Sequence, residues 1–267
     1  MKKQISKITI LCIVIISAIA CKKENVSNNI DYSKYKIKQA IRHSGTIDTT
    51  IYYYNGENTD EFSAYNNTTT KYLRKYIKNG NQFDLEFYSN SVKTHEGISI
   101  LNAQGFIDSS RLTYIPTMSF NNRSKSYFDA NGFAIRDIND YNSYINDVKK
   151  FYTAAGDFKY WIYDLYYPAT PADNQRDSIV FEFDLSKPLH VLYEFALQER
   201  YGKPNQHLVT KRLTYNTLAG NVLKSTREYK YEVDANGLVT KRINTSYSQP
   251  GNILITSDTT YYSYYMN

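Results

Sequence analysis

The length, composition and charge of this chain limit the class of protein it can be. It has 267 residues, including 28 tyrosines and only two cysteines, and its 32 basic and 26 acidic side chains give a formal charge of +6. Three of the lysines lie in a predicted signal peptide, so the mature chain carries 29 basic and 26 acidic residues, a charge of +3. This weak, evenly spread charge excludes the electrostatic footprint of a DNA- or RNA-binding protein, and no nucleic-acid partner is predicted.

Residues 1–20 have the pattern of a signal peptide. Three lysines precede an apolar run from residue 8 to residue 20 that is too short to span a bilayer. The stretch SAIAC, which ends at Cys21, resembles the lipobox of bacterial lipoproteins, whose cysteine is acylated and becomes the first mature residue. Ala18 stands where that motif commonly has leucine, so ordinary cleavage that leaves Cys21 as a free thiol stays open as an alternative. The resemblance implies a lipid anchor on Cys21.

A lipidated Cys21 would make the membrane the first partner of this protein. Each buried acyl methylene contributes about 0.8 kcal/mol, so several chains on one residue hold firmly. The residues from Cys21 to position 33 are polar and unpatterned after the cysteine, which predicts a flexible tether. Lys22 beside the cysteine is compatible, by analogy with other bacterial lipoproteins, with transport to the outer membrane. We therefore expect a cell-envelope location, with the periplasmic or surface face left open.

Residues 34–267 are predicted to form one β-rich domain. Segments with a two-residue alternation of apolar and polar side chains follow one another closely, and short turns separate them. About 235 residues are enough to bury a core without disulfides. Long strand-like segments joined by short turns favour an antiparallel meander.

A turn motif recurs along the chain. It reads DANG in YFDANGFAIR (127–136) and YEVDANGLVTKR (231–242), and a looser copy occurs in LNAQGFIDSSR (101–111). A calcium loop needs oxygen ligands at alternate positions, but the fifth position holds Phe133 or Leu238. A hairpin needs only a polar first corner and a glycine with positive φ. The motif therefore predicts hairpin turns and no metal.

An insertion at about 138–177 is expected to interrupt the sheet. In DYNSYINDVKKFYTAAG (140–156), apolar residues recur at three- and four-residue intervals, Asp140 can cap the start and Gly156 the end, which together predict a short helix. The following DFKYWIYDLYYP (157–168) is apolar on every face and fits either a strand or a buried helix. The stretch from Tyr166 to Ser178 is typical of an exposed loop.

The tyrosines predict that the sheet curls. In the C-terminal YYSYYMN, Tyr261 and Tyr265 would lie on one face of a strand, and Tyr262 and Tyr264 on the other. A flat sheet would expose one of these aromatic sets to water, so we expect either a partly rolled, open-barrel-like sheet or a helix across the second face. The predicted fold class is a mostly β protein: a large curved antiparallel meander with one short helical insertion.

The repeated hairpins, together with GKPNQHLVTKRLTY before the last of them, resemble uncharacterised Bacteroidota-type lipoproteins described as having a porin-like, partly rolled antiparallel sheet. The likeness is clearest from Tyr201 to Tyr264. The motif is also similar to the Tyr-Asp repeats of large secreted proteins, so it specifies a hairpin better than it specifies a family. The resemblance implies an envelope location and a β fold, and it brings no catalytic residues.

The sequence contains little that indicates catalysis. It has no nucleophile elbow, phosphate loop or zinc-protease motif, and its four histidines (43, 95, 190 and 207) lack ligand spacing, so neither a cofactor nor a metal is predicted. The best acid pair is Glu182 and Asp184, about 6.5 to 7 Å apart on one face of a strand. That separation is close to the range of inverting glycosidases, although a solvated strand face produces it equally well.

Aromatic residues provide the best binding candidates. Trp161 is the only tryptophan and lies near Tyr166 and Tyr167, beside the predicted loop. Such rings can stack on a sugar or simply fill the core. Two functions remain open: a non-catalytic envelope module that binds or scaffolds a glycan, lipid or protein, and an envelope hydrolase that uses Glu182 and Asp184. The sequence favours the first, because no group with a tuned environment is visible.

Overall fold

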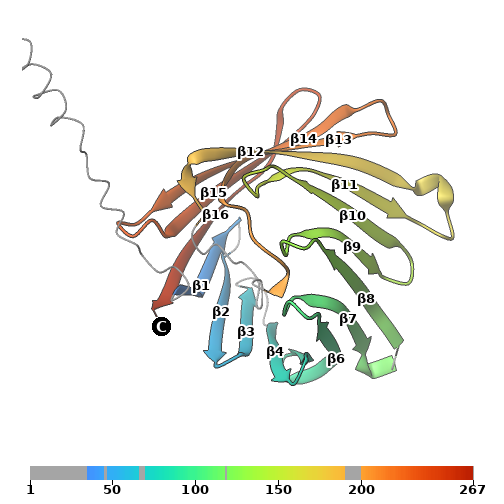
Figure 1. The fold of residues 1–267 in the computed structure, drawn as a ribbon, viewed down its shortest axis with the longest axis vertical. Helices are drawn as coiled ribbons and strands as arrows, with labels where there is room; N and C mark the ends of the chain where they lie inside the picture. Colours follow the sequence, from blue (N-terminus) through green and yellow to red (C-terminus); the bar gives the residue numbers. More distant parts are fainter. Residues whose placement is uncertain (1–34, 45–46, 66–69, 118, 190–199, 267) are drawn as a thin grey trace, which may run out of the picture. The chain divides into compact units, whose positions relative to one another are not determined.

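The computed structural model describes residues 35–44, 47–65, 70–117, 119–189 and 200–266. In these residues all the strands belong to one antiparallel sheet that closes into a barrel, because β1 pairs with β16 (Figure 1). The predicted signal peptide, Cys21 and the tether lie outside the described residues. The strands are β1 (Tyr35–His43), β2 (Ile47–Asn55), β3 (Asn58–Tyr65), β4 (Lys71–Asn79), β5 (Gln82–Ser89), β6 (Val92–Leu101), β7 (Ile107–Tyr114), β8 (Ser119–Phe128), β9 (Ala134–Asp140), β10 (Ile145–Tyr152), β11 (Phe158–Tyr166), β12 (Gln175–Pro188), β13 (His207–Asn216), β14 (Val222–Val233), β15 (Val239–Ser248) and β16 (Ile253–Met266), with short 3-10 helices η2 (Ile115–Thr117) and η3 (Pro171–Asp173).

The predicted antiparallel meander is confirmed, and its two ends meet. Each strand pairs with the next one along the chain, and the last pairs with the first from Tyr35 opposite Met266 to His43 opposite Thr259. Closure removes both free sheet edges, whose unpaired backbone groups would otherwise be open to association with other chains. The curl expected from the tyrosines is therefore complete.

The DANG segments are hairpin turns. Asp129 accepts hydrogen bonds from the backbone N–H groups of Asn131 and Phe133, both at 2.9 Å, and the glycine of the motif has a φ of 86°. The same two bonds form to the side-chain oxygen of Asp234 and, in the looser copy, of Asn102. The hairpin prediction is confirmed.

The predicted helix is wrong. Residues 145–152 form β10, and the turn before it contains Asn142 with a φ of 66°. Along β10, Val148 and Lys150 face the barrel interior, whereas Lys149 faces outward opposite Arg136. The two-residue period was hidden because aromatic residues lie on both faces and because the inward position 150 holds a lysine.

The region after β10 is also a strand hairpin. Gly156 does not cap a helix: it has a φ of 90° in a fourth hairpin turn, where Thr153 takes the place of the motif's aspartate. The segment that fitted either a strand or a helix is β11, and the predicted exposed loop is shortened to residues 167–174, because β12 already begins at Gln175.

The tyrosines of β16 divide between the two faces of the barrel wall as the alternation requires. Tyr262 is buried inside, and the hydroxyl of Tyr264 donates to the carbonyl of Val239 at 2.7 Å. Tyr261 lies outside, half exposed beside His43, with its ring 5.5 Å from the imidazole. A closed wall shelters the first set and leaves the second at the water interface, where a phenol is well suited.

Buried apolar side chains gather at one end of the barrel, the end at which β1 begins. In an antiparallel meander, all even-numbered strands finish at that end. Two clusters lie there, one formed by Ile37, Tyr52, Leu208, Val239 and Tyr262, and the other by Phe83, Leu85, Leu101 and Ile107. Toward the other end, the inward side chains are mostly polar, among them Ser63, Asn244, Ser246 and Asp258.

Residues 200–206, which lead into β13, lie at the apolar end. They lie within the ring of strands in Figure 1 and are called the plug below. Arg200 forms an ion pair with Glu57 in the β2–β3 turn at 2.8 Å, and the N–H of Lys203 donates to the carbonyl of Gly132 in the β8–β9 turn at 2.9 Å. Because these turns belong to strands far apart in the chain, the plug crosses the barrel opening.

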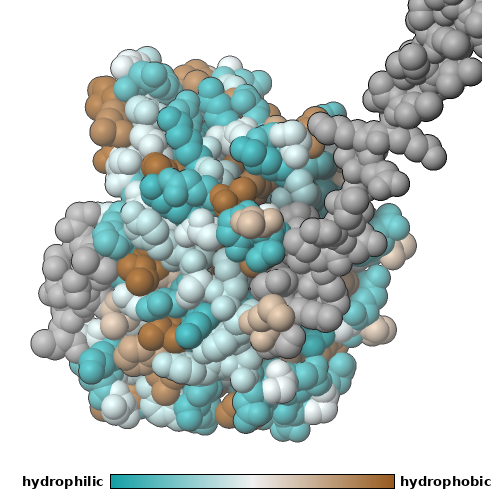
Figure 2. All heavy atoms as spheres, turned by 90° about the vertical axis from the view of Figure 1, so that its left-hand side faces the viewer, coloured by the Kyte–Doolittle hydropathy of each residue, from teal (hydrophilic) through white to brown (hydrophobic). Residues whose placement is uncertain are grey.

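The outer face of the barrel carries charged residues on many strands. Arg136 on β9 binds Asp147 on β10 through two hydrogen bonds of 2.8 and 2.7 Å, and Arg176 on β12 binds Asp164 on β11 in the same way. Asp147 and Asp164 are direct cross-strand neighbours. Lys241 on β15 pairs with Glu232 on the outer face of β14. Figure 2 shows hydrophilic residues spread over the face turned to the viewer, with apolar residues scattered among them.

Candidate functional site

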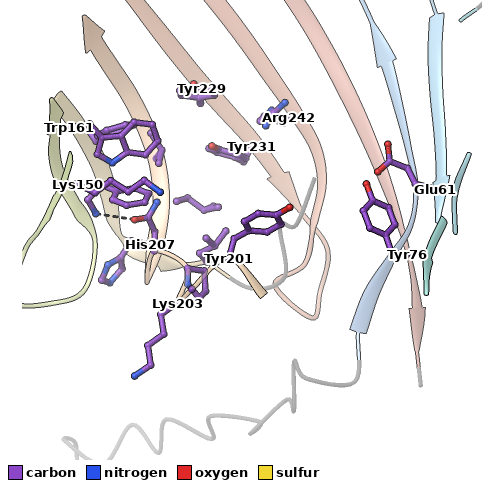
Figure 3. Close-up of a pocket in the computed structure, with 18 of the residues that line it drawn as sticks. Glu61, Tyr76, Lys150, Trp161, Tyr201, Lys203, His207, Tyr229, Tyr231 and Arg242 are labelled. Atoms are coloured by element: carbon purple, nitrogen blue, oxygen red, sulfur yellow. Dashed lines mark hydrogen bonds between the residues drawn. The ribbon is translucent and has the colours of Figure 1, made fainter. Parts of the chain in front are cut away.

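A cavity of about 590 Å³ lies inside the barrel, against the plug. Figure 3 shows Trp161, Tyr229 and Tyr231 on one side, Glu61 and Tyr76 across from them, and Tyr201 of the plug between the two sides. Phe181 and Leu208 also line the cavity. The closed barrel brings together residues as far apart in the chain as Glu61 and Arg242.

The aromatic side of the cavity is built by β11, β12 and β14. Trp161 makes contacts with Phe158 and Phe181, with ring centroids 4.8 Å apart in each case, and the ammonium of Lys150 lies 5.7 Å from the indole. Lys150 also forms an ion pair with Asp137. The indole N–H is buried and has no hydrogen-bond partner in the described residues. A ligand beside this wall would find flat apolar faces and an unused donor.

The opposite side pairs a cation with an acid. Arg74 on β4 donates to Glu61 on β3 at 2.6 Å, and Glu61 is almost fully buried. Burial raises the pKa of the neighbouring Tyr76 phenol, and the charge of Glu61 raises it further. Burial also raises the pKa of the Tyr201 phenol in the plug. Tyr201 lines the cavity, and 47% of its surface stays accessible. Both phenols are therefore neutral hydrogen-bond groups at physiological pH.

A buried aspartate holds the plug against the wall. Asp157 is 1% exposed and accepts the backbone N–H groups of Gln206 and His207 at 2.8 and 2.9 Å. Its second oxygen lies 2.6 Å from Nδ1 of His207, whose ring lines the cavity. Asn205 completes the attachment by accepting the N–H of Phe158 at 2.9 Å. These contacts position the plug and the imidazole relative to the aromatic wall.

The structure separates the three predicted binding residues. Trp161 faces the cavity. Tyr166 points outward instead, beside the ion pair of Asp164 and Arg176, and is 39% exposed. Tyr167 lies at the barrel end opposite the plug, where its N–H donates to Asn174 at 2.8 Å. The alternation of a strand places neighbouring aromatic residues on opposite faces, so proximity in sequence does not produce a common site here.

The predicted acid pair lies on the outer face. Glu182 and Asp184 follow Phe181 on β12 and do not line the cavity. The hydroxyl of Ser186 donates to Asp184 at 2.5 Å, and this bond, supported by Lys187, lowers the pKa of the Asp184 carboxyl. A carboxyl held in its charged form cannot serve as the proton donor of a glycosidase at neutral pH.

The sequence did not reveal the inward-facing arginines. Arg74 and Arg242 line the cavity, and Arg212 and Arg227 lie on the same inner face of β13 and β14. An arginine at alternate positions of a strand normally indicates a solvated face. The sequence offers one signal: Arg227 is separated from Tyr229 and Tyr231 by even numbers of residues, so the three side chains belong to the same face of the strand.

The described part of the chain contains no helix with the length and hydrophobicity of a membrane span. Within those same residues, no three histidine, cysteine or acidic side chains are close enough to hold a metal ion together.

No family model and no curated protein matches the chain in sequence. The solved structures do provide a match. The chain is similar in fold to porin-like proteins of Bacteroides. One, from Bacteroides uniformis, is 10% identical with a TM-score of 0.56, and the alignment covers 86% of this chain and 96% of that one. Another, from Bacteroides vulgatus, is 9% identical with a TM-score of 0.58, covering 86% and 98%. At these identities the similarity to porin-like proteins concerns the fold alone.

Proposed function

We propose that this protein is a lipid-anchored, non-catalytic binding protein of the bacterial cell envelope, which holds a glycan fragment inside its barrel. The observation that carries the proposal is the interior cavity, closed at one end by the plug and walled by Trp161, Tyr229 and Tyr231. Its volume of about 590 Å³ lies within the common range of roughly 300–1,000 Å³ for small-molecule sites. Flat aromatic faces beside a few charged groups suit a sugar ring.

The outer face supports attachment beside the membrane rather than insertion through it. A membrane-spanning barrel presents an apolar band about 25 Å tall, and an arginine or lysine facing lipid at mid-depth costs about 2–4 kcal/mol. Here Arg136, Asp147, Asp164 and Arg176 form a charged row on the outer face, one residue on each of the neighbouring strands β9 to β12. An acylated Cys21 provides membrane contact without that cost. The porin-like neighbours agree with an envelope barrel.

Lipid attachment is tested with Cys21→Ser in a bacterial host. We expect the native chain in the membrane fraction and the variant in the soluble fraction, still folded. A variant that stays with the membrane would contradict the lipid anchor.

Ligand binding is tested by titrating the full chain with glycan fragments while following Trp161 fluorescence and thermal unfolding. At a hundredfold excess over Kd, a ligand of the folded state adds about 2.7 kcal/mol, which raises the Tm by several degrees. Trp161→Ala or Tyr229→Ala should weaken binding, whereas the matched outward variant Tyr166→Ala should not. Equal loss in all three variants would rule out the cavity as the site, and cleavage of the glycan during incubation would contradict a non-catalytic role.

A further inference from the structure

Two arginines face each other inside the barrel. Arg212 on β13 and Arg227 on β14 are direct cross-strand partners, and Arg212 also lies opposite Phe181, which lines the cavity. Like charges at directly opposed positions of a sheet repel each other. Both guanidinium groups stay protonated at physiological pH, so this repulsion persists in the folded protein.

Neither arginine has a carboxylate partner among the described residues. Other cations of the barrel have such a partner: Arg42 pairs with Asp258, and Lys224 pairs with Asp177. Asp177 influences Arg212 electrostatically, but its carboxylate is already held by Lys224 at 2.8 Å. Burial lowers the pKa of Arg212.

The hydrogen-bond donors of the pair are only partly used. Nε of Arg227 donates to the hydroxyl of Ser246 at 3.0 Å. Nε of Arg212 is buried without a partner in the described residues. A buried donor without an acceptor costs free energy, and a charged one costs more. The site therefore lacks an acceptor with negative charge.

An apolar surface adjoins the arginine pair. Phe181, opposite Arg212, has its ring centroid 4.8 Å from that of Trp161, whose indole N–H is also buried and unused. A ligand that fits both parts needs an anionic group at one end and a ring at the other. Planar guanidinium forks suit the oxygens of carboxylate, sulfate and phosphate groups.

We propose that Arg212 and Arg227 bind the oxyanion of an anionic sugar, whose ring lies against Trp161 and Phe181. The inference rests on the proposed function, because it names the ligand class of that interior site and extends the site from the cavity lining at Phe181 and Tyr229 to the adjacent Arg212 and Arg227. It predicts selectivity: the ligand must be charged, and its neutral analogue must bind poorly.

The test compares matched pairs of probes on the full chain: glucuronate against glucose, and glucose 6-sulfate and glucose 6-phosphate against glucose. Binding is followed by calorimetry and by thermal unfolding at fixed ionic strength. The variants are Arg212→Met and Arg227→Met, which keep a long apolar side chain. Arg111→Met is the control, because Arg111 lies opposite Arg123 in a second cross-strand arginine pair, on the outer face.

We expect at least one anionic probe to bind native protein at least tenfold tighter than glucose, and we expect Arg212→Met and Arg227→Met each to abolish that preference. Arg111→Met should keep it. Without ligand, Arg212→Met should unfold at a higher temperature than the native chain, because the repulsion and the unused donor are gone, a result that a merely structural arginine would not produce.

The outcomes separate the two proposals. If sugars bind but charged and neutral probes bind equally, or if Arg212→Met keeps the preference, the anion site is overturned while the binding barrel stands. If no probe, charged or neutral, shifts the unfolding of native protein, the anion site is overturned, and the binding barrel loses its support as well.

Discussion

The outer and inner faces of the barrel wall differ in whether their opposed like charges are neutralised by a partner of opposite charge. Outside, Asp147 and Asp164 face each other on neighbouring strands, and an arginine binds each of them through two hydrogen bonds. Inside, Arg212 and Arg227 face each other in the same arrangement, and no acid binds either in the described residues. Neutralised charges stabilise a wall, whereas unsatisfied buried ones cost stability, and a ligand of opposite charge would remove that cost.

The largest expected effect comes from breaking the outer row. Arg176→Met leaves Asp164, only 2% exposed, as a buried carboxylate beside Asp147. Removing one partner of a buried pair costs about 3–5 kcal/mol, and the partial exposure of Arg176 lowers our expectation to about 2–3 kcal/mol. Urea unfolding measures this loss, with Arg212→Met as the inward counterpart. Equal destabilisation by both variants would remove the distinction between the faces.

Alkaline pH should lower the stability of the folded barrel mainly through phenols on its inner face. Burial raises the pKa of Tyr76 above its usual 10.0, so the folded state retains this proton while the unfolded state loses it. The stabilisation is complete below pH 10 and declines as the pH rises toward the folded pKa, by up to about 1.4 kcal/mol per pH unit. Unfolding at pH 9 and pH 11 should therefore show a smaller decline in Tyr76→Phe than in the native chain. An unchanged decline would indicate that this phenol is not sheltered.

A smaller effect is expected at the inner arginine pair. Ser246→Ala removes the hydroxyl that accepts from Arg227 and leaves a second guanidinium donor without a partner. Loss of such a bond costs about 1–2 kcal/mol. If an anion occupies the pair, a saturating anionic probe should restore much of this loss. Destabilisation that ligand does not reduce would indicate a purely structural bond.

The smallest effect is expected at an exposed outer pair. Lys241 binds Glu232 at 2.7 Å, but the glutamate side chain is 63% exposed. Exposed pairs contribute little, so Lys241→Ala should lower the free energy of unfolding far less than Arg176→Met does. A loss as large as that of Arg176→Met would mean that pairing itself, rather than burial of the carboxylate, determines the effect.

Much of the fold was predictable because its determinants are local. The hairpin turns at Asp129 and Asp234 depend on one side chain and one glycine within four residues. The division of the β16 tyrosines follows from the period of a strand. The helix prediction over residues 140–156 failed for a local reason too: with aromatic residues on both faces and Lys150 inside, the apolar pattern resembled a helical period.

The candidate site was predictable only in part. Trp161 was proposed because tryptophan is conspicuous, and it lines the interior cavity, but its sequence neighbours Tyr166 and Tyr167 belong to other surfaces. Arg212 and Arg227 gave no signal, because an alternating arginine on a strand looks the same whether it faces solvent or a polar interior. Asp157 and His207 are 50 positions apart, and only the plug brings them together.

The sequence by itself determined the β class, the antiparallel order and the positions of several turns, because each depends on contacts between residues close in the chain. Tertiary structure alone decided that β1 pairs with β16, that residues 200–206 cross one end, and that one of two equivalent strand faces became the interior. A two-residue period assigns side chains to two faces without distinguishing inside from outside. That choice follows from the curvature of the whole sheet, which depends on pairing between the two ends of the chain.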